Sequence, residues 1–257
     1  GDKVTITGEN FGTDPSDISV SFNGTPAEFE LVDESTIVAT TPADYKTGNV
    51  TVTIHGYTMT GSAMFNPNSK GDVTVLYLQN YKQPFAKAND ENWKNGEWWT
   101  PAVWNQNAAS FNAKGNTTVS GMQYKSEEGL TLAFQNGWDK EAYTNGKMWQ
   151  VATLRPGKYR LEVTYAYTLV VTDAGNFISV LIAKGDSESD IPNVADLEQL
   201  NGVYVVYDKM GTANDSGTLV TPSFEVTETT DVVIGFLTSL AKGNSYFKVT
   251  ELKLILE

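Results

Sequence analysis

Short segments in which apolar and polar residues alternate recur along this chain, and they constrain its fold more than any other feature. Ile18, Val20 and Phe22 alternate with two serines and are followed by Asn23-Gly24, a pair typical of tight hairpin turns. A period of two predicts strands with one buried face. Many such segments, with turn residues between them and no regular strand–helix alternation, predict an all-β protein.

The first 66 residues contain the clearest set of predicted strands. They are short, and Gly, Asn and Pro separate them, which favours a small β-sandwich over residues 1–66. The predicted strands are 4–6, 18–22, 27–32, 36–40, 50–55 and 62–65.

Three blocks of this region resemble the IPT/TIG family: VTITGENFG at 4–12, VSFNG at 20–24 and IVATTP at 37–42. The resemblance implies an immunoglobulin-like sandwich, used in cell-surface receptors, glycan-processing enzymes and some transcription factors, mostly as a spacer. The usual first strand of the family would lie before Gly1. We therefore expect either a chain cut from a longer precursor or a domain with an open sheet edge.

A turn-forming run, NPNSKG at 66–71, separates two apolar runs and marks a domain boundary. We predict a linker at 67–71 and a second domain at 72–257. Strands predominate there too, which predicts a jelly-roll-type sandwich. Within it we expect a first strand at 73–78, a helix over 191–200, and a hairpin in which 155–158 joins strands 148–154 and 159–167. Residues 102–105 fit either a helical turn or a strand.

Four blocks of the second domain are similar to galactose-binding-like domains: TPAVW at 100–104, NGKMWQVATLRPGKYRL at 145–161, IGF at 234–236 and YFKVTELKL at 246–254. More narrowly, they resemble a C-terminal domain of unknown function in Bacteroidetes surface lipoproteins, over most of residues 75–256. This resemblance implies a jelly-roll (galactose-binding-like) β-sandwich, in which structural calcium is frequent. It also implies export, glycan capture, and an outer-membrane lipid anchor that lies outside this chain.

Composition excludes several classes of function. The net charge is −13 and only two arginines are present, which argues against nucleic acid as a partner. The absence of cysteine removes thiol catalysis and Cys-ligated metals. A single histidine, His55, makes a Ser-His-Asp triad improbable, and no nucleophile elbow or phosphate loop is present. We therefore predict that the chain is not an enzyme.

All six tryptophans lie between Trp93 and Trp149. Trp104 and Trp149 fall in the blocks that define the second domain, so we expect them to be structural. The other rings are surrounded by amides and carboxylates, which suits a polar ligand with apolar faces, such as a sugar. Local packing or an interdomain contact is the alternative. The candidate ligand-binding residues are Trp93, Trp98, Trp99, Trp138, Asn92, Asn95 and Asp139.

A stretch without Lys or Arg carries acids at alternate positions, Asp186, Glu188 and Asp190. Hard oxygen ligands in this arrangement can surround Ca²⁺, so the three residues are a candidate structural calcium site. The segment lacks the glycine and terminal glutamate of an EF-hand loop. A solvated acidic loop is the alternative.

These observations predict a non-catalytic glycan-binding protein of the cell surface. An immunoglobulin-like spacer would present a sandwich similar to a carbohydrate-binding module, with a polysaccharide or oligosaccharide as ligand. The alternative is an adhesion or assembly protein that binds another cell-surface protein through its aromatic patch. In both cases we expect an extracellular location and an outer-membrane lipoprotein, attached to the membrane only through a lipid anchor outside this chain.

Overall fold

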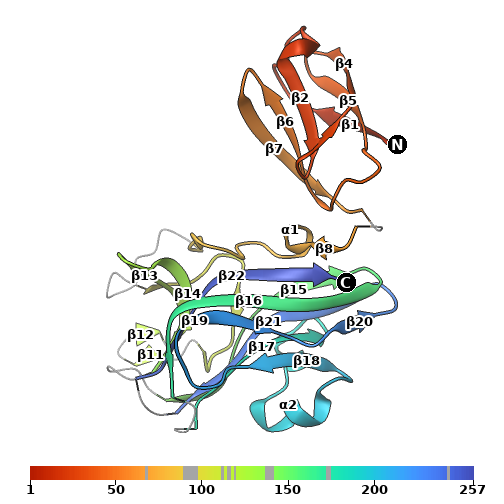
Figure 1. Cartoon of the computed structure of the whole chain (residues 1–257). Helices are drawn as coiled ribbons and strands as arrows, with labels where there is room; N and C mark the ends of the chain where they lie inside the picture. Colours follow the sequence, from red (N-terminus) through yellow and green to blue (C-terminus); the bar gives the residue numbers. More distant parts are fainter. Residues whose placement is uncertain are drawn as a thin grey trace. The chain divides into compact units, whose positions relative to one another are not determined.

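The computed structural model of the protein describes the whole chain except residues 67–68, 89–97, 111–112, 115–116, 119, 137–141, 172–174 and 242–243. Six further residues in strands, 113, 114, 117, 118, 213 and 214, are described in their backbone alone. The chain divides into two compact units, Gly1–Leu76 and Tyr77–Glu257 (Figure 1). Among the described residues, no helix has the length and apolar character needed to cross a bilayer.

The first unit is a small sandwich of antiparallel strands. Its described strands form one sheet in the order β1-β5-β4 and another in the order β3-β2-β6-β7. Asn23 and Gly24 have φ values of 45° and 83°, as the tight turn between β2 and β3 requires. The bounds are β1 Lys3–Thr7, β2 Ile18–Phe22, β3 Thr25–Ala27, β4 Phe29–Asp33, β5 Thr36–Thr40, β6 Gly48–Ile54 and β7 Tyr57–Met64, with a 3₁₀ turn at Pro15–Asp17.

One side of this sandwich is open. Among the described strands, β1 is an edge of one sheet and β7 an edge of the other, and a groove of about 430 Å³ lies between them. Val4 and Ile6 of β1, with Val52 and Met59, line it and make it mostly apolar. Strand β7 carries no charged side chain, and Tyr57 on it is 80% exposed. An uncharged, unpaired edge of this kind favours pairing with a further strand.

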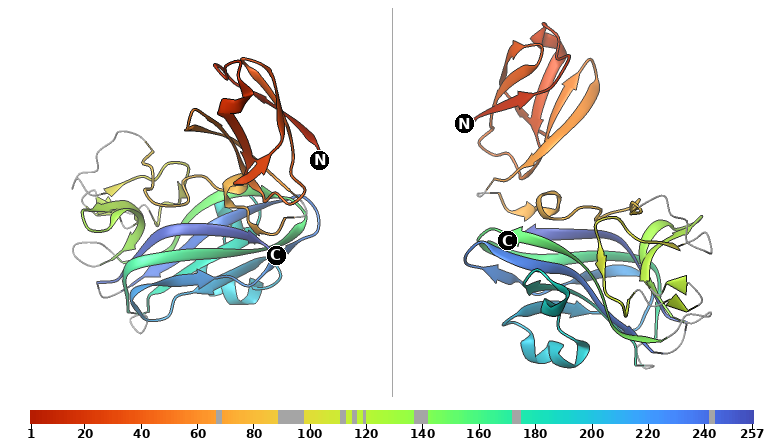
Figure 2. Two further views of the ribbon diagram at one scale, coloured as in Figure 1. Left: turned by 45° about the horizontal axis from the view of Figure 1, so that its top comes forward. Right: turned by 180° about the vertical axis from the view of Figure 1, so that it is seen from behind.

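The second unit is a sandwich of two antiparallel sheets (Figures 1 and 2). The small sheet has the order β10-β15-β21-β17-β18, and the large sheet has the order β19-β16-β22-β14-β13-β9, with β20 also beside β16. The all-β class is therefore confirmed. The bounds are β9 Trp98–Trp99, β10 Asn105–Gln106, β11 Ala113–Lys114, β12 Thr117–Thr118, β13 Ser120–Lys125, β14 Gly129–Gln135, β15 Tyr143–Leu154, β16 Gly157–Val170, β17 Phe177–Lys184, β18 Val205–Lys209, β19 Ala213–Val220, β20 Phe224–Val226, β21 Thr230–Leu240 and β22 Tyr246–Leu256.

Aromatic side chains fill the space between the two sheets. Phe236 of the small sheet lies 5.0 Å from Phe134 and 6.3 Å from Phe247 of the large sheet, between ring centroids. All three rings are fully buried. Trp104 adds a fourth ring, 5.7 Å from Phe236. This core fixes which face of each strand points inward, and alternation then assigns the other face to the outside.

A short helix covers the outer face of the small sheet. Helix α2, Val194–Leu200, lies on the side of this sheet away from β16 and β22 (Figure 1). Its Leu197 is buried with Trp149, Leu181 and Val233 in one apolar cluster. We call this region, with Lys147, the α2 face. The helix predicted over 191–200 is present, but it begins later, after Asn193, because a 3₁₀ turn at Glu188–Asp190 precedes it.

Two predictions about local structure are wrong. Residues 73–78 were expected to form a strand, but after β8, Gly71–Asp72, the chain forms the helical turn α1, Thr74–Tyr77. The Asp72 side chain accepts hydrogen bonds from the backbone N and hydroxyl of Thr74, at 3.0 and 2.6 Å, which stabilises a turn at this point. The apolar residues of segment 73–78 fit a strand pattern and a buried turn equally well.

Strands β15 and β16 do not form the predicted hairpin. Strand β15 pairs with β10 and β21 of the small sheet, whereas β16 pairs with β19, β20 and β22 of the large sheet. The connection at Arg155-Pro156 therefore crosses from one sheet to the other. Leu154 and Tyr159 on either side of it are both fully buried, which a crossover between sandwich layers allows. Residues 102–103 form a turn and Asn105–Gln106 a short strand, so neither alternative for 102–105 holds throughout.

Candidate functional site

Trp98 and Trp99 form β9, at the edge of the large sheet. Trp98 lies opposite Gln123 of β13 and Trp99 opposite Met122. Successive side chains point to opposite faces, so the two rings lie on different sides of the sheet. Trp98 is only 2% exposed, whereas Trp99 is half-buried. Trp98 therefore packs within the protein and, contrary to the prediction, offers no stacking surface, while Trp99 retains part of one.

The remaining five predicted ligand-binding residues belong to the segments 89–97 and 137–141. Asn92, Trp93, Asn95, Trp138 and Asp139 all lie outside the described residues. The candidate site is therefore built from Trp99 and the described side chains around it.

Lys87 lies beside the ring of Trp99. A β-bridge pairs Lys87 with Pro101, which follows β9 closely in the chain. This pairing holds the Lys87 ammonium 5.8 Å from the Trp99 ring centroid, near the outer limit of a cation–π contact. Lys87 is itself exposed, and Trp99 is partly exposed.

Tyr124 is the second aromatic residue of this edge. It lies two positions beyond Met122 on β13 and so shares the face of Trp99. Diagonal neighbours of this kind are about 7–8 Å apart between Cα atoms. Tyr124 is 45% exposed. Two partly open aromatic rings therefore stand side by side on one face.

A hydrogen-bond donor and an acceptor near these rings lack partners. Among the described residues, neither Nε1 of Trp99 nor Oε1 of Gln106 has a hydrogen-bond partner, although both atoms are buried. Gln106 donates from Nε2 to Oγ of Ser120, at 3.1 Å, and Ser120 shares the face of Trp99. Each unpartnered buried group costs about 1–3 kcal/mol. A hydroxyl group both donates and accepts, so it is the chemistry that this pair suits.

We call Lys87, Trp99, Gln106, Ser120 and Tyr124 the Trp99 edge. On the opposite face of the same strands, Gln123 and Thr131 are cross-strand partners, and both are almost completely buried. Oε1 of Gln123 and Oγ1 of Thr131 also lack partners among the described residues. As whole residues they are almost completely buried, whereas Trp99 and Gln106 are partly exposed, so we do not include them in the site.

The other described tryptophans are structural, as expected. Trp104 is 5% exposed and donates from Nε1 to the backbone oxygen of Asn80, at 3.0 Å. Trp149 is buried in the apolar cluster under α2. Both rings are buried by packing, so neither is a candidate for ligand contact.

The three acids predicted as a calcium site do not come together as one. Among the described residues, no group of three or more His, Cys, Asp or Glu side chains is arranged to hold a metal ion. The Asp190 carboxylate instead accepts hydrogen bonds from the Ser187 hydroxyl at 2.6 Å and the Tyr204 hydroxyl at 3.0 Å. These bonds, the Ser187 bond foremost, lower the pKa of Asp190. The Asp190 carboxylate therefore stabilises a loop here.

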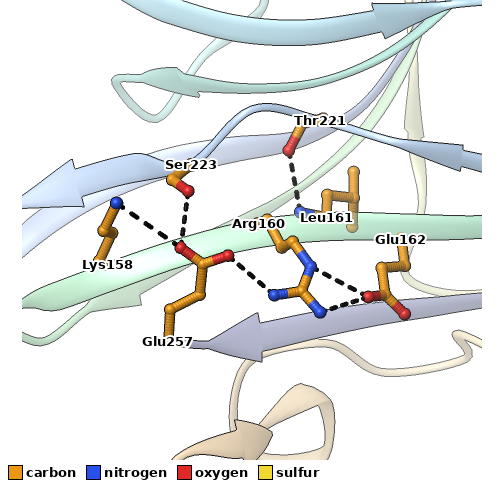
Figure 3. Close-up of polar contacts among 7 residues, drawn as sticks. All are labelled: Lys158, Arg160, Leu161, Glu162, Thr221, Ser223 and Glu257. Atoms are coloured by element: carbon orange, nitrogen blue, oxygen red, sulfur yellow. Dashed lines mark hydrogen bonds and ion pairs between the residues drawn. The ribbon is translucent and has the colours of Figure 1, made fainter.

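The charged side chains at the end of β22 also pair with one another (Figure 3). Arg160 donates to Glu162 at 2.7 Å and to Glu257 at 2.8 Å. Ser223 donates to the other oxygen of Glu257 at 2.6 Å, and this bond, followed by that of Arg160, lowers the pKa of the carboxyl. With Lys158 3.9 Å from Glu257, these charges neutralise one another and join β16 to the chain end. The cluster is therefore a structural tie.

Lys87, Gln106, Ser120 and Tyr124 were missed in the sequence. Tyr124 lies in an ordinary strand pattern, which does not indicate that its ring is exposed. Gln106 and Ser120 meet only because the two sheets approach at this edge. A signal that did exist is the pair of adjacent tryptophans, since alternation places the two rings on opposite faces of the strand.

Comparison with known families agrees with this architecture. Residues 79–235, more than half of the chain, match the family described as the domain of unknown function DUF5013. The chain belongs to this family. Residues 1–70 match the IPT/TIG domain, so the first unit is an immunoglobulin-like IPT/TIG domain followed by the DUF5013 domain. The resemblance to the IPT/TIG family, and that of the second domain to a domain of unknown function, are thereby confirmed.

Several solved structures are distantly similar to the chain. TmCBM61 in complex with β-1,4-galactotriose is 12% identical, with a TM-score of 0.37 over 70% of this chain and 100% of that chain. The xylan-binding module CBM15 is 14% identical, with a TM-score of 0.34 over 60% and 90%. The K3 adhesin domain of Lys-gingipain from Porphyromonas gingivalis W83 is 11% identical, with a TM-score of 0.34 over 66% and 98%. Likenesses this distant carry no argument about ligand. No curated protein sequence matches the chain.

Proposed function

We propose that the DUF5013 domain binds a glycan, without catalysis, at the Trp99 edge. The observation that carries the proposal is the half-buried ring of Trp99, whose indole N–H lacks a partner among the described residues and lies beside the exposed ring of Tyr124. Sugar rings present apolar C–H faces and hydroxyl groups together. The aromatic rings would contact the faces, while Trp99 Nε1 and Gln106 Oε1 would bind a hydroxyl.

The proposal is limited to binding because of the groups that surround Trp99. The described side chains of the edge are an ammonium, a phenol, an amide and a hydroxyl. Glycoside hydrolysis ordinarily needs two carboxyl groups across the scissile bond. The edge supplies contacts and hydrogen bonds, which suit recognition. Weak individual sites would gain useful affinity when several copies engage one polymer.

The IPT/TIG domain would act as a spacer that presents the binding domain at the cell surface. This location, and attachment to an outer membrane by a lipid anchor outside this chain, follow from the family resemblance. The test is protease treatment of intact cells that produce the full-length protein. Loss of the protein from intact cells, with a periplasmic control retained, supports the proposal, and protection until the cells are lysed contradicts it.

Glycan binding is tested by titrating the full chain with a panel of neutral and acidic polysaccharides and oligosaccharides. Tryptophan fluorescence and heat are the two readouts. Trp99→Ala and Tyr124→Ala should each weaken binding on the order of tenfold, which is about 1.4 kcal/mol. Tyr167→Ala is the matched control, because Tyr167 is also a 45% exposed tyrosine of the same domain, away from β9. No binding across the panel, or equal affinities for all variants, refutes the proposal.

One observation favours a second function, the binding of another protein. Strand β7 of the IPT/TIG domain is an uncharged edge among the described strands, with Tyr57 80% and Met59 44% exposed. Such an edge suits the addition of a strand from a partner. Retention of a surface protein on the immobilised chain, with no glycan bound, would favour this function. Met59→Lys should then abolish retention, because a charge on an edge strand opposes strand pairing.

A further inference from the structure

The turn that follows β9 contains a strained residue. Val103 has φ of 62°, in the left-handed region, and 53% of its surface is exposed. A β-branched side chain is rare in this conformation, which Gly and Asn adopt more readily. An exposed valine also leaves apolar surface in water. On both counts Val103 is a poor choice for the stability of the turn.

The side chain of Asn80 holds this turn in place. Its Nδ2 donates to the backbone oxygens of Ala86 and Ala102, at 2.9 and 3.0 Å, and its Oδ1 accepts from the backbone N of Ala86, at 2.7 Å. Trp104, just after Val103, donates to the backbone oxygen of Asn80. Backbone strain persists where the surroundings over-determine a conformation, and these four bonds do so on both sides of Val103.

The turn is continuous with the Trp99 edge. Ala102 donates from its backbone N to the oxygen of Ala86 at 2.8 Å, one step beyond the bridge between Pro101 and Lys87. The same short ladder therefore carries Trp99 at one end and Val103 at the other. Trp104 turns inward and packs on Phe236, whereas Val103 at this end is open to solvent.

We propose that Val103 is a ligand-contact residue of the glycan site, where it supplies an apolar surface to a C–H face of the bound sugar next to Trp99. This inference rests on the proposed function of the Trp99 edge. A residue that weakens the turn yet is exposed beside a binding surface fits the general conflict between stability and function. The bound sugar would bury the valine side chain and so recover the apolar area that is exposed in the free protein.

The test uses two substitutions in the full chain. Val103→Asn relieves the strain and removes the apolar surface, whereas Val103→Ala removes most of the surface and keeps an L-residue with a Cβ. We expect Val103→Asn to unfold at a higher urea concentration than wild type, and both variants to bind the polysaccharide that wild type binds about fivefold more weakly. Val203→Asn is the control, because Val203 is a 76% exposed valine outside this edge, and it should leave binding unchanged.

The outcomes separate the two proposals. If wild type binds a polysaccharide and Val103→Asn binds it equally well, Val103 is no contact residue and only this inference fails. A lower unfolding midpoint for Val103→Asn contradicts the strain on which the inference rests. If wild type binds nothing in the panel, the proposed function fails and the inference falls with it.

Discussion

The α2 face and the Trp99 edge contain similar residues and differ in what covers them. Each has a tryptophan, a lysine and amide side chains nearby. On the α2 face, Trp149 is buried, and the ammonium of Lys147 donates to the backbone oxygens of Glu188 and Ile191, at 3.2 and 2.6 Å. On the Trp99 edge, the indole N–H has no partner among the described residues and the lysine is exposed. The same residue types thus serve as core in one place and as a candidate surface in the other.

The covering helix accounts for the difference. Helix α2 and the turn before it supply both the apolar side chains that pack on Trp149 and the carbonyl groups that accept from Lys147. Burial there lowers the pKa of Lys147, with the nearby Glu188 carboxylate opposing the effect, so the carbonyl bonds are needed to hold the ammonium. The described part of the Trp99 edge has no such cover. The buried α2 face stabilises the fold, whereas the partly exposed Trp99 edge can contact a ligand.

Truncation of the two tryptophans should separate these roles most strongly. We expect Trp149→Ala to lower the free energy of unfolding by about 3–5 kcal/mol, because it leaves a cavity under α2. Trp99→Ala should cost only about 1 kcal/mol, since the ring is partly exposed. Urea denaturation followed by far-ultraviolet circular dichroism measures both values. Equal losses would mean that Trp99 is as much a core residue as Trp149.

The buried lysine provides the next largest effect. Lys147→Met keeps the length of the side chain but leaves the carbonyls of Glu188 and Ile191 without their donor, so we expect a loss of about 2 kcal/mol. Lys184→Met is the control, because Lys184 is an exposed lysine of the same sheet, and it should change stability by less than about 0.5 kcal/mol. A neutral Lys147→Met would show that desolvation of the ammonium cancels its hydrogen bonds.

A pair of buried threonines compares a hydrogen-bonded hydroxyl group with an unpartnered one. Thr238 bonds with the Tyr143 hydroxyl at 3.0 Å, whereas Oγ1 of Thr131 has no partner among the described residues. Both side chains are fully buried. Thr238→Val should cost about 1–2 kcal/mol, and Thr131→Val should be neutral or stabilising. Destabilisation by Thr131→Val would indicate that a water molecule or ligand occupies this position in solution.

The sequence was sufficient to predict the strands and the all-β class, but it did not predict which strands are neighbours. Alternation in segments such as Ile18–Phe22 predicts strands directly, since it reflects burial of one face. It does not say which strands are neighbours, so the hairpin predicted across Arg155-Pro156 became a crossover between sheets. The alternation of apolar and polar residues is the same whether the next strand forms a hairpin with the first or joins the other sheet.

Predicting the candidate site also required knowing which strands are neighbours. The adjacent Trp98 and Trp99 indicate that the two rings lie on opposite faces of the sheet, but which ring stays partly exposed depends on what covers each face beside β13. Gln106 and Ser120 come from different sheets, and no local pattern connects them. The acids at 186–190 show the opposite error. Their spacing suits a cation, yet Asp190 already has hydroxyl and backbone donors around it.

The smallest expected effect concerns this acidic loop, which precedes helix α2. Because the pKa of Asp190 is lowered in the folded state, its carboxylate stabilises the fold above its ordinary value of 3.8 and loses this contribution as the pH falls through the lowered value. Asp190→Asn should therefore unfold earlier than wild type at about pH 7, and the difference should shrink when urea denaturation is repeated below about pH 3.8. Asp186→Asn, at an exposed acid of the same loop, should show little difference at either pH. If millimolar Ca²⁺ instead raised the unfolding midpoint of wild type but not of Asp190→Asn, the carboxylate would be a metal ligand, and the loop would belong with the open, ligand-binding regions.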